Sequence, residues 1–349
     1  MTTITLIEGD GIGPEICDAT LRVLTAVGFE ADWDVQPAGA AVLEAEGSPL
    51  PQRVLDSIAA TGLALKGPVT TPVGTGFRSI NVCLRQTFDL YANIRPCRSF
   101  PGLALPFSDV DVVIFRENTE DLYAGIEFAA GSADVAHLAE LAGGKLPSEA
   151  AVSLKPITEA GSRRIVTAAF DYARDNGRHK VTAVHKANIM KETDGLFLRV
   201  AREVAAERDI AFDELIVDAA CMKLVTAPSS FDVIVTENLY GDILSDLCAG
   251  LIGGLGLAAG ANIGEAAAVF EAVHGSAPDI AGKGIANPTA LILSAALMLR
   301  HVGEAGKAAR IESAVARVIA EGRVLTADLT DNASAASTRE YTDALVAAL

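Results

Sequence analysis

Short β-rich apolar runs alternate with helical patterns along this chain, and no other feature limits its possible folds as strongly. The runs cover residues 3–7, 63–65, 110–115, 180–185, 214–217 and 233–236. Helical patterns lie between several of them, and the one over 158–176 places Ile165, Val166, Ala169, Phe170 and Ala173 on one face. Strands that alternate with helices predict an α/β protein with a largely parallel sheet.

Three stretches that are rich in glycine or apolar residues each predict a local structure. Gly9-Asp-Gly-Ile-Gly13 leads into a helix expected over 14–27, but it lacks the G-x-G-x-x-G spacing of a Rossmann dinucleotide motif. The uncharged run 247–264 contains six glycines and predicts a glycine-rich loop rather than a membrane span. The almost uninterrupted apolar run 290–300 predicts a buried core helix.

Length and charge narrow the class of protein. A chain of 349 residues predicts two domains. A net charge of −17 repels nucleic acid and anionic membranes, so we expect neither as a partner. The N-terminus lacks the pattern of a secretory signal, and the five scattered cysteines form no CxxC pair. They predict reduced thiols in a cytoplasmic protein.

Positive charge gathers in one region of this acidic chain. Residues 62–108 hold five cations, Lys66, Arg78, Arg85, Arg95 and Arg98, against the single acid Asp89, and Arg116 follows. Clustered arginines suit a small polyanion because each guanidinium can hold a carboxylate through two parallel hydrogen bonds. Ordinary surface ion pairs are the alternative explanation.

Two further segments carry candidate chemistry. Asp242 and Asp246 stand four residues apart, hence on one helix face, where like charges are unfavourable unless a cation lies between them. Their hard oxygens favour Mg²⁺ or Mn²⁺ over zinc, although a solvated acidic face is the alternative. The glycine-rich stretch 274–287 offers backbone N–H groups to phosphates, or is an ordinary tight connection before a helix. Lys186 and Tyr123 lie in polar settings that by themselves decide nothing.

Taken together, these segments resemble the isocitrate and isopropylmalate dehydrogenase family of metal-dependent β-decarboxylating dehydrogenases. The resemblance extends from Gly9 to Gly303, and its most specific part is NLYGDILSDLCAGLIGGLG over 238–256. It implies a two-domain, non-Rossmann α/β fold with an active-site cleft between the domains. The large cofactor-binding domain would be discontinuous, over 1–98 and 251–349. The small dimerisation domain would cover 99–250, with a clasp-like segment near 127–153.

The resemblance also implies residue roles. Arg85, Arg95 and Arg116 would clamp the substrate, and Asp242 and Asp246 would bind the metal. Asp218, as a further metal ligand, and Lys186, which helps to deprotonate the substrate hydroxyl, would come from the partner protomer. Tyr123 would protonate the enol carbon after CO₂ has left. Because the active site is completed across an interface, the expected functional unit is a homodimer.

Substrate and cofactor follow from the same resemblance. Ser79 and Asn81 match the positions that bind the γ-carboxylate in isocitrate enzymes, so the expected reaction is the NAD-dependent conversion of isocitrate to 2-oxoglutarate and CO₂, a tricarboxylic acid cycle step. Homoisocitrate or another anionic isocitrate analogue is the alternative, and a non-catalytic regulatory subunit is a second one.

Asp279 and Ile280 favour NAD, because a carboxylate repels the 2′-phosphate of NADP. The remaining cofactor positions are Thr71, Asn188, His274, Gly275 and Asn287. The sequence leaves the choice between Mg²⁺ and Mn²⁺, allosteric ligands and assembly beyond a dimer open.

Overall fold

The computed structural model describes residues 2–70, 79–330 and 335–349. Its strands are β1 (Thr2–Ile7), β2 (Ala31–Val35), β3 (Leu63–Lys66), β4 (Ala92–Arg98), β5 (Asp111–Glu117), β6 (Glu127–Phe128), β7 (Val152–Ser153), β8 (Lys180–His185), β9 (Ala211–Ile216), β10 (Val233–Thr236), β11 (Ala259–Ile263) and β12 (Ala268–Ala272). Its α-helices are α1 (Gly13–Ala26), α2 (Ala40–Glu46), α3 (Gln52–Thr61), α4 (Ile80–Thr87), α5 (Ala133–Leu141), α6 (Glu159–Asp175), α7 (Thr193–Ala206), α8 (Val217–Leu224), α9 (Asn238–Leu251), α10 (Thr289–His301), α11 (Ala305–Glu321) and α12 (Thr338–Ala348). Short 3₁₀ turns, η1 (Asp121–Ala124), η2 (Pro228–Ser230) and η3 (Leu255–Leu257), complete these elements.

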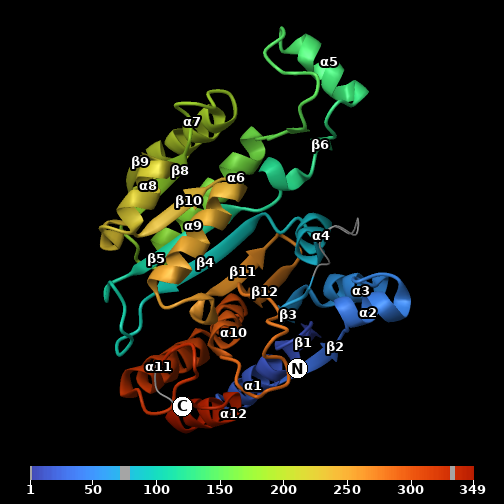
Figure 1. Cartoon of the computed structure of the whole chain (residues 1–349). Helices are drawn as coiled ribbons and strands as arrows, with labels where there is room; N and C mark the ends of the chain where they lie inside the picture. The colour runs from blue at the N-terminus through green and yellow to red at the C-terminus, as the bar shows by residue number, and fades with distance from the viewer. Residues whose placement is uncertain (1, 71–78, 331–334) are drawn as a thin grey trace.

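The large sheet has the strand order β2-β1-β3-β12-β11-β4-β5-β10-β8-β9 (Figure 1). Its two ends are parallel, as the alternation of strands and helices predicts, so the α/β class is confirmed. In the middle, β11 pairs antiparallel with β12 and β4, and β4 pairs antiparallel with β5. Sequence patterns do not predict β4, because its sequence ANIRPCR contains two arginines and a proline, or β11, whose sequence AGANI has little β-propensity.

The helices predicted over 14–27, 158–176 and 290–300 correspond to α1, α6 and α10. Thr158 caps the first turn of α6 through its side chain, which fixes where that helix begins. The expectation of a loop over 247–264 is wrong for most of that run. It contains the last turn of α9, the 3₁₀ turn η3 and strand β11, because its small residues pack inside the core.

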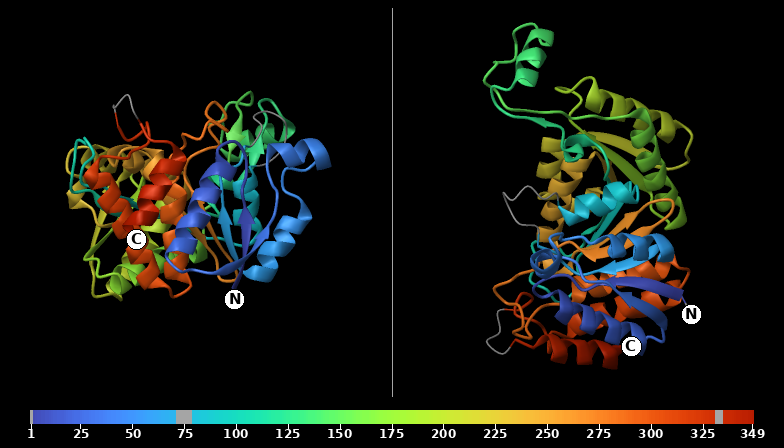
Figure 2. Two further views of the ribbon diagram at one scale, coloured as in Figure 1. Left: turned by 90° about the horizontal axis from the view of Figure 1, so that it is seen from below. Right: turned by 90° about the vertical axis from the view of Figure 1, so that its right-hand side faces the viewer.

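Three apolar clusters cover the sheet. The largest joins α1, α9, α10, α11 and α12 to the strands, a second lies between α6, α7 and the strands β5, β8 and β10, and a third lies under α3 and α4. Among the described residues, no helix is both long enough and apolar enough to cross a membrane. α5 and the β6–β7 ribbon project from the body as an arm (Figures 1 and 2).

Strand order bears on the domain boundaries. The strands from 1–98 and 251–349 lie together at one end of the large sheet, and those from 99–250 lie together at the other. Both chain termini lie at the first end (Figure 1). The division into two domains stays a prediction. In the strand order, the residues from 1–98 and 251–349 meet those from 99–250 between β4 and β5. These two strands carry Arg95 and Arg116.

Candidate active site

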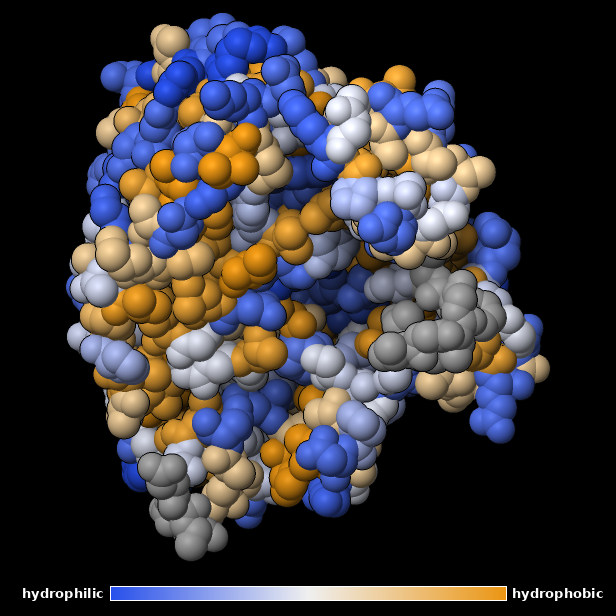
Figure 3. Space-filling view, turned by 45° about the horizontal axis from the view of Figure 1, so that its top comes forward, coloured by the Kyte–Doolittle hydropathy of each residue, from blue (hydrophilic) through white to orange (hydrophobic). Residues whose placement is uncertain are grey.

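A polar cavity of about 120 Å³ opens beside the antiparallel middle of the sheet. Asn81 and Arg85 from α4 and Arg95 from β4 line one part of it, and His274 and Gly275, which follow β12, line another. Residues expected to bind substrate and residues expected to bind cofactor are therefore neighbours. A space-filling view shows a hydrophilic hollow on one face of the molecule, beside a broad band of hydrophobic side chains (Figure 3).

Arg85 is buried in the last turn of α4, where a cation interacts favourably with the helix dipole. Burial lowers the pKa of its guanidinium, and Glu271 opposes that effect from 3.6 Å. Its Nε is buried and has no hydrogen-bond partner among the described residues. A substrate carboxylate would supply that partner, because buried charged donors are costly when they are left unpaired.

Arg95 and Arg116 face the same side of the β4–β5 ladder, because Arg116 lies opposite Asn93, two residues before Arg95. Arg95 donates to Asn93 Oδ1 at 2.8 Å and to Ser245 Oγ at 3.2 Å. Burial, reinforced by the charges of Arg116 and Arg85, lowers its pKa to about 10. Arg116 donates through Nε to Asn238 Oδ1 at 2.9 Å, and its buried Nη2 lacks a partner in the described part of the chain.

Gly241 makes room for Arg116. A Cβ atom on this glycine of α9 would lie 2.5 Å from Cγ and 2.6 Å from Cβ of Arg116, closer than real Cβ contacts. Arg116 is itself 1% exposed and held by Asn238, so it has little freedom to move aside. The absence of a side chain at 241 therefore fixes the depth at which the guanidinium sits.

α9 carries both aspartates on one face, as their spacing predicts, and brings them to the arginines. Asp242 pairs with Arg116 and accepts a hydrogen bond from the Tyr123 hydroxyl, and Asp246 Oδ1 lies 3.6 Å from Arg95 Nη1. Burial favours a raised pKa for Asp242, but Arg116 and the Tyr123 hydroxyl hold that pKa below its ordinary value. For Asp246 burial dominates and raises the pKa. Burial also raises the pKa of Tyr123, and the Asp242 carboxylate adds to the effect.

A divalent cation fits the donor set of α9. The side chains of Asp242 and Asp246 remain 37% and 58% exposed, so carboxylate oxygens on successive turns are accessible. Asp218 does not join them within one chain, since no group of three or more metal-capable side chains occurs among the described residues. Instead, Lys186, which follows β8, donates a hydrogen bond to Asp218 on α8. Each chain therefore carries the predicted site residues in two separate groups.

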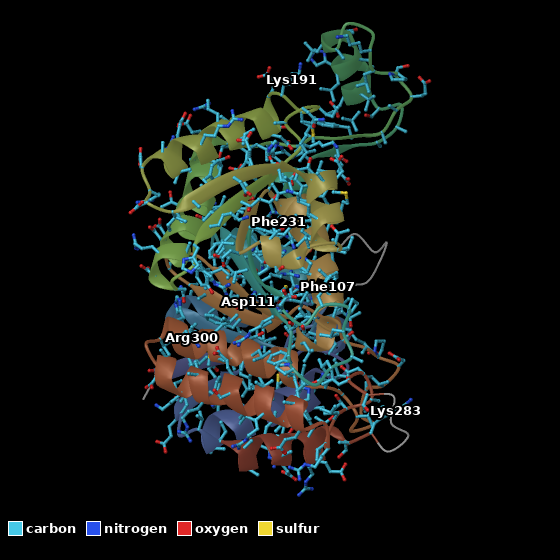
Figure 4. All side chains as sticks on the ribbon, turned by 90° about the vertical axis from the view of Figure 1, so that its left-hand side faces the viewer. Phe107, Asp111, Lys191, Phe231, Lys283 and Arg300 are labelled. Carbon is cyan, nitrogen blue, oxygen red and sulfur yellow. The ribbon has the colours of Figure 1, made fainter. Side chains whose placement is uncertain are left out.

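The predicted nucleotide residues occupy the connection between β12 and α10. His274 contacts the carbonyl of Gly275 through Nδ1, burial lowers its pKa, and its buried Nε2 has no partner in the structure as described. Asp279 is exposed and Ile280 packs against the main core. Further along the same connection, Lys283 extends away from the body (Figure 4).

Three other cofactor positions have different surroundings. Asn287 is buried, and its Nδ2 donates to Asp328 Oδ2 at 2.9 Å, while its Oδ1 accepts from the backbone N–H of Thr289 at the start of α10. Its side chain is thus already held by residues on both sides. Asn188 is exposed in the turn after Lys186, and Thr71 falls outside the described residues.

The first glycine-rich loop supports this connection rather than forming a Rossmann motif. A Cβ on Gly9 would lie 2.0 Å from the Pro68 carbonyl oxygen, and one on Gly11 would lie 2.0 Å from that of Ser276. Both glycines have positive φ angles, of 76° and 60°. The loop therefore packs backbone to backbone against the segments that follow β3 and β12.

Sequence patterns do not predict the buried ion pair of Lys66 and Glu271, of which Glu271 also faces Arg85. Lys66 is one of the clustered cations of the sequence, yet it is buried and its Nζ lies 2.6 Å from Glu271. Glu271 also accepts from Asn262 Nδ2 at 2.9 Å and stands opposite Lys66 in the β3–β12 register. A charged residue inside an apolar strand is the available signal in both cases, because such residues are rarely buried unless paired.

Known proteins are similar to this chain along almost its whole length. The family model for isocitrate/isopropylmalate dehydrogenase matches residues 3–345. The isocitrate dehydrogenase structure from Methylococcus capsulatus superposes with a TM-score of 0.92 at 56% identity, covering 100% of this chain and 99% of that one. Two mitochondrial NAD isocitrate dehydrogenase proteins are each 50% identical. The regulatory protein of Dictyostelium discoideum aligns over 98% of this chain and 90% of its own length, and the alpha subunit of Macaca fascicularis over 95% and 91%. The chain belongs to the isocitrate/isopropylmalate dehydrogenase family.

Proposed function

We propose that this protein catalyses the metal-dependent oxidative decarboxylation of isocitrate to 2-oxoglutarate and CO₂, with reduction of NAD. The observation that carries the proposal is the meeting of three buried arginines with the two accessible carboxylates of α9. Two of those arginines have buried, unpartnered nitrogens among the described residues. Such a site suits a ligand with several carboxylates together with a divalent cation.

Polar groups on α4 favour isocitrate over a substrate with an apolar branch. Asn81 lines the cavity, and its buried Oδ1 has no partner in the described part of the chain. Ser79 immediately precedes α4 and makes no capping hydrogen bond to its backbone, so its hydroxyl is available to a ligand. An isopropyl group would leave these polar groups unpaired, which is costly. Homoisocitrate or another anionic analogue is the alternative, since it would also satisfy them.

The chain's own residues divide the work of the reaction. When bound, Mg²⁺ or Mn²⁺ would acidify the substrate hydroxyl and stabilise negative charge on its oxygen, and NAD would accept the hydride. Arg85, Arg95 and Arg116 orient the carboxylates. Lys186 relays the hydroxyl proton away, and Tyr123, a phenol that is protonated at neutral pH, delivers a proton to the carbon that loses CO₂.

NAD is favoured over NADP by the charge at Asp279. This exposed carboxylate lies in the connection that follows the cavity-lining His274 and Gly275. It can accept hydrogen bonds from ribose hydroxyls, whereas it would repel a 2′-phosphate. The names of the two mitochondrial relatives also specify NAD.

A homodimer would unite the two groups of site residues. Exposed hydrophobic side chains occur on the elements next to Lys186 and Asp218: Ile189 follows Lys186, Met222 lies on α8 and Ile243 on α9, and they are 69%, 57% and 51% exposed. The arm adds Leu141, which is 72% exposed. Burial of these surfaces against a second copy would bring Lys186 and Asp218 to the partner's Asp242 and Asp246.

A regulatory, non-catalytic role is a second candidate, favoured by the name of the Dictyostelium relative. Against it, Tyr123, Lys186, Asp218, Asp242 and Asp246 are all present and hydrogen-bonded or ion-paired. A purified homomeric sample that forms NADH and 2-oxoglutarate in equal amounts from isocitrate, and stops when EDTA is added, supports catalysis. A sample that binds isocitrate without forming NADH supports the regulatory role.

We also propose a cytoplasmic location. All five cysteines are unpaired, and Cys17, Cys97 and Cys248 are buried. A reducing compartment suits such a set of thiols. Fractionation of the source cells would test this proposal, since recovery from an extracytoplasmic fraction would contradict it.

A further inference from the structure

A buried ammonium group lies between two acids outside the cavity. Lys155 precedes α6, and its Nζ lies 2.5 Å from Asp194 Oδ1 and 2.8 Å from Glu237 Oε2. The two acidic side chains are 0% and 1% exposed, and that of Lys155 is 12% exposed. The ring of Tyr240 covers the ammonium at 4.6 Å. Buried charges at this spacing depend on one another, because removal of one leaves the others unpaired.

The first acid reaches the loop that carries Lys186. Asp194 lies in the first turn of α7, and its Oδ2 accepts a hydrogen bond of 2.6 Å from the backbone N–H of Lys186. Lys155 therefore fixes the carboxylate that anchors this loop, while the Lys186 side chain turns to Asp218. Lys191, further along the same loop, lies at the end of the molecule from which α5 projects (Figure 4).

The second acid reaches the helix of the metal carboxylates. Glu237 is the N-cap residue of α9, whose next residue, Asn238, holds Arg116. One turn later the same helix presents Asp242. Lys155 thus also holds the residue from which α9 starts. Burial raises the pKa of Glu237 to about 8 although Lys155 opposes the change. The charged form of this acid is therefore unfavourable at its buried position, and removal of Lys155 would disfavour it further.

We propose that Lys155 is a positioning residue that links two active sites. This inference rests on the proposed dimer, in which each chain gives α9 to its own site and Lys186 with Asp218 to its partner's site. A displacement of Lys155 therefore moves α9 in the chain's own site and the Lys186 loop in its partner's site. The cluster of Lys155, Asp194 and Glu237 therefore makes the geometry of one site depend on that of the other.

Mixed dimers isolate this effect. One chain carries Lys186→Met and its partner carries Asp242→Asn, so one of the two sites retains every catalytic group. Lys155→Met is then added to one chain or to the other. In the Lys186→Met chain it acts on the intact site through α9, and in the Asp242→Asn chain it acts through the Lys186 loop.

The expected result is a loss of about 10-fold or more in kcat with isocitrate in both placements, because small displacements of catalytic groups cost at least that much. When Lys155→Met acts through α9, the KM for NAD should stay unchanged, because the nucleotide connection follows β12, which is separated in the sheet from β10. When it acts through the Lys186 loop, the KM for NAD should rise as well, because that loop also carries Asn188, an expected cofactor position. Lys155→Arg keeps a cation between the acids and should give a smaller loss in both placements. If Lys155→Met does not fold, the two placements are compared with Lys155→Arg instead.

Lys180→Met is the matched control. Lys180 begins the same strand, β8, its side chain is 30% exposed, and its Nζ binds the Ser230 carbonyl at 2.5 Å. This variant should leave kcat unchanged. An active parent dimer whose rate responds to the Lys155 variants in only one placement, or in neither, overturns the linkage alone. An inactive parent dimer overturns the shared site itself, and the linkage with it.

Discussion

The Tyr123 hydroxyl donates a hydrogen bond to the Asp242 carboxylate, so the proposed proton donor contacts a proposed metal ligand within one chain. The guanidinium of Arg116 lies over the Tyr123 ring at 4.9 Å and also pairs with Asp242. Burial and the neighbouring carboxylate raise the pKa of Tyr123 above its ordinary value, so the phenol keeps its proton at neutral pH and into the alkaline range. Proton delivery, metal binding and substrate clamping therefore share a single hydrogen-bonded group.

Tyr123→Phe should lower kcat by about 100-fold or more, because a positioned general acid contributes about that much, while KM for isocitrate changes little. Initial rates of NADH formation measure both constants. Tyr91→Phe is the control. The Tyr91 ring contacts the guanidinium of Arg164 at 4.7 Å and, among the described residues, none of the three substrate arginines. Equal activity of the two variants would remove Tyr123 from the reaction.

Gly241→Ala should raise KM for isocitrate by about 10-fold, equivalent to about 1.4 kcal/mol, because the added methyl group displaces Arg116. Gly250→Ala lies on the same helix, with no atom within 4 Å of its new Cβ, and should leave KM unchanged. A titration of initial rate against isocitrate concentration compares them. If both variants keep the parent KM, the depth of Arg116 does not matter for binding.

Glu271 should contribute to stability against acid. Burial favours a raised pKa, but Lys66, Arg85 and the Asn262 amide hold the pKa near 2, below the ordinary value of 4.5. A lowered folded-state pKa contributes stability that is present above pH 4.5 and is lost as pH falls through 2, here on the order of 3 kcal/mol. Glu271→Gln should therefore be less stable than the parent at pH 7, with a difference that narrows as the pH is lowered from 4.5 toward 2.

Urea denaturation midpoints at a series of pH values check this prediction. Glu30→Gln, at an exposed position, supplies the comparison and should unfold as the parent does at every pH. A constant difference between Glu271→Gln and the parent across the acid range would show that titration of Glu271 is not linked to folding.

Ile243→Asp should abolish self-association and activity together, because it places a charge in the apolar face of α9 that the proposed dimer buries. Light scattering should give twice the chain mass of 36.1 kDa for the parent and the single mass for the variant. Val35→Asp, at a 52% exposed position on the edge strand β2, should remain dimeric and active. An active monomeric Ile243→Asp would contradict the shared site.

The sequence predicted β1, β3, β5, β8 and β10, but it missed the edge strand β2 and the neighbouring strands β12, β11 and β4. β8 and β10 are apolar runs with the bounds expected, because both strands are buried and lie between turn residues. β4 could not be recognised, because Arg95 and Asn93 face the polar site and give it no apolar alternation.

Motif positions likewise identified Arg116, Tyr123, Asp242 and Asp246, which the structure brings together. They did not identify Lys155 or Glu271, whose importance lies in contacts with residues 82 and 205 positions away along the chain. Pairing of buried charges at such separations depends on the completed fold, and single-sequence patterns do not contain it.

Asp279→Ala should raise KM for NAD by an amount worth about 1–3 kcal/mol and change KM for NADP little, because the variant loses hydrogen bonds to the ribose hydroxyls together with the charge that repels a 2′-phosphate. Asp343→Ala is a suitable control, since Asp343 pairs with Arg22 on the surface formed by α1 and α12. Equal changes for both cofactors would show that Asp279 does not discriminate between them.

The central claim is tested most directly by initial-rate absorbance at about 340 nm, where reduced nicotinamide absorbs. Isocitrate, homoisocitrate, 3-isopropylmalate and tartrate are each combined with NAD or NADP in the presence of Mg²⁺ or Mn²⁺. We predict the highest kcat/KM for isocitrate with NAD. A higher value for another anionic 2-hydroxy acid would contradict the assignment of Ser79 and Asn81, and no rate with any pair would contradict the proposed catalytic function.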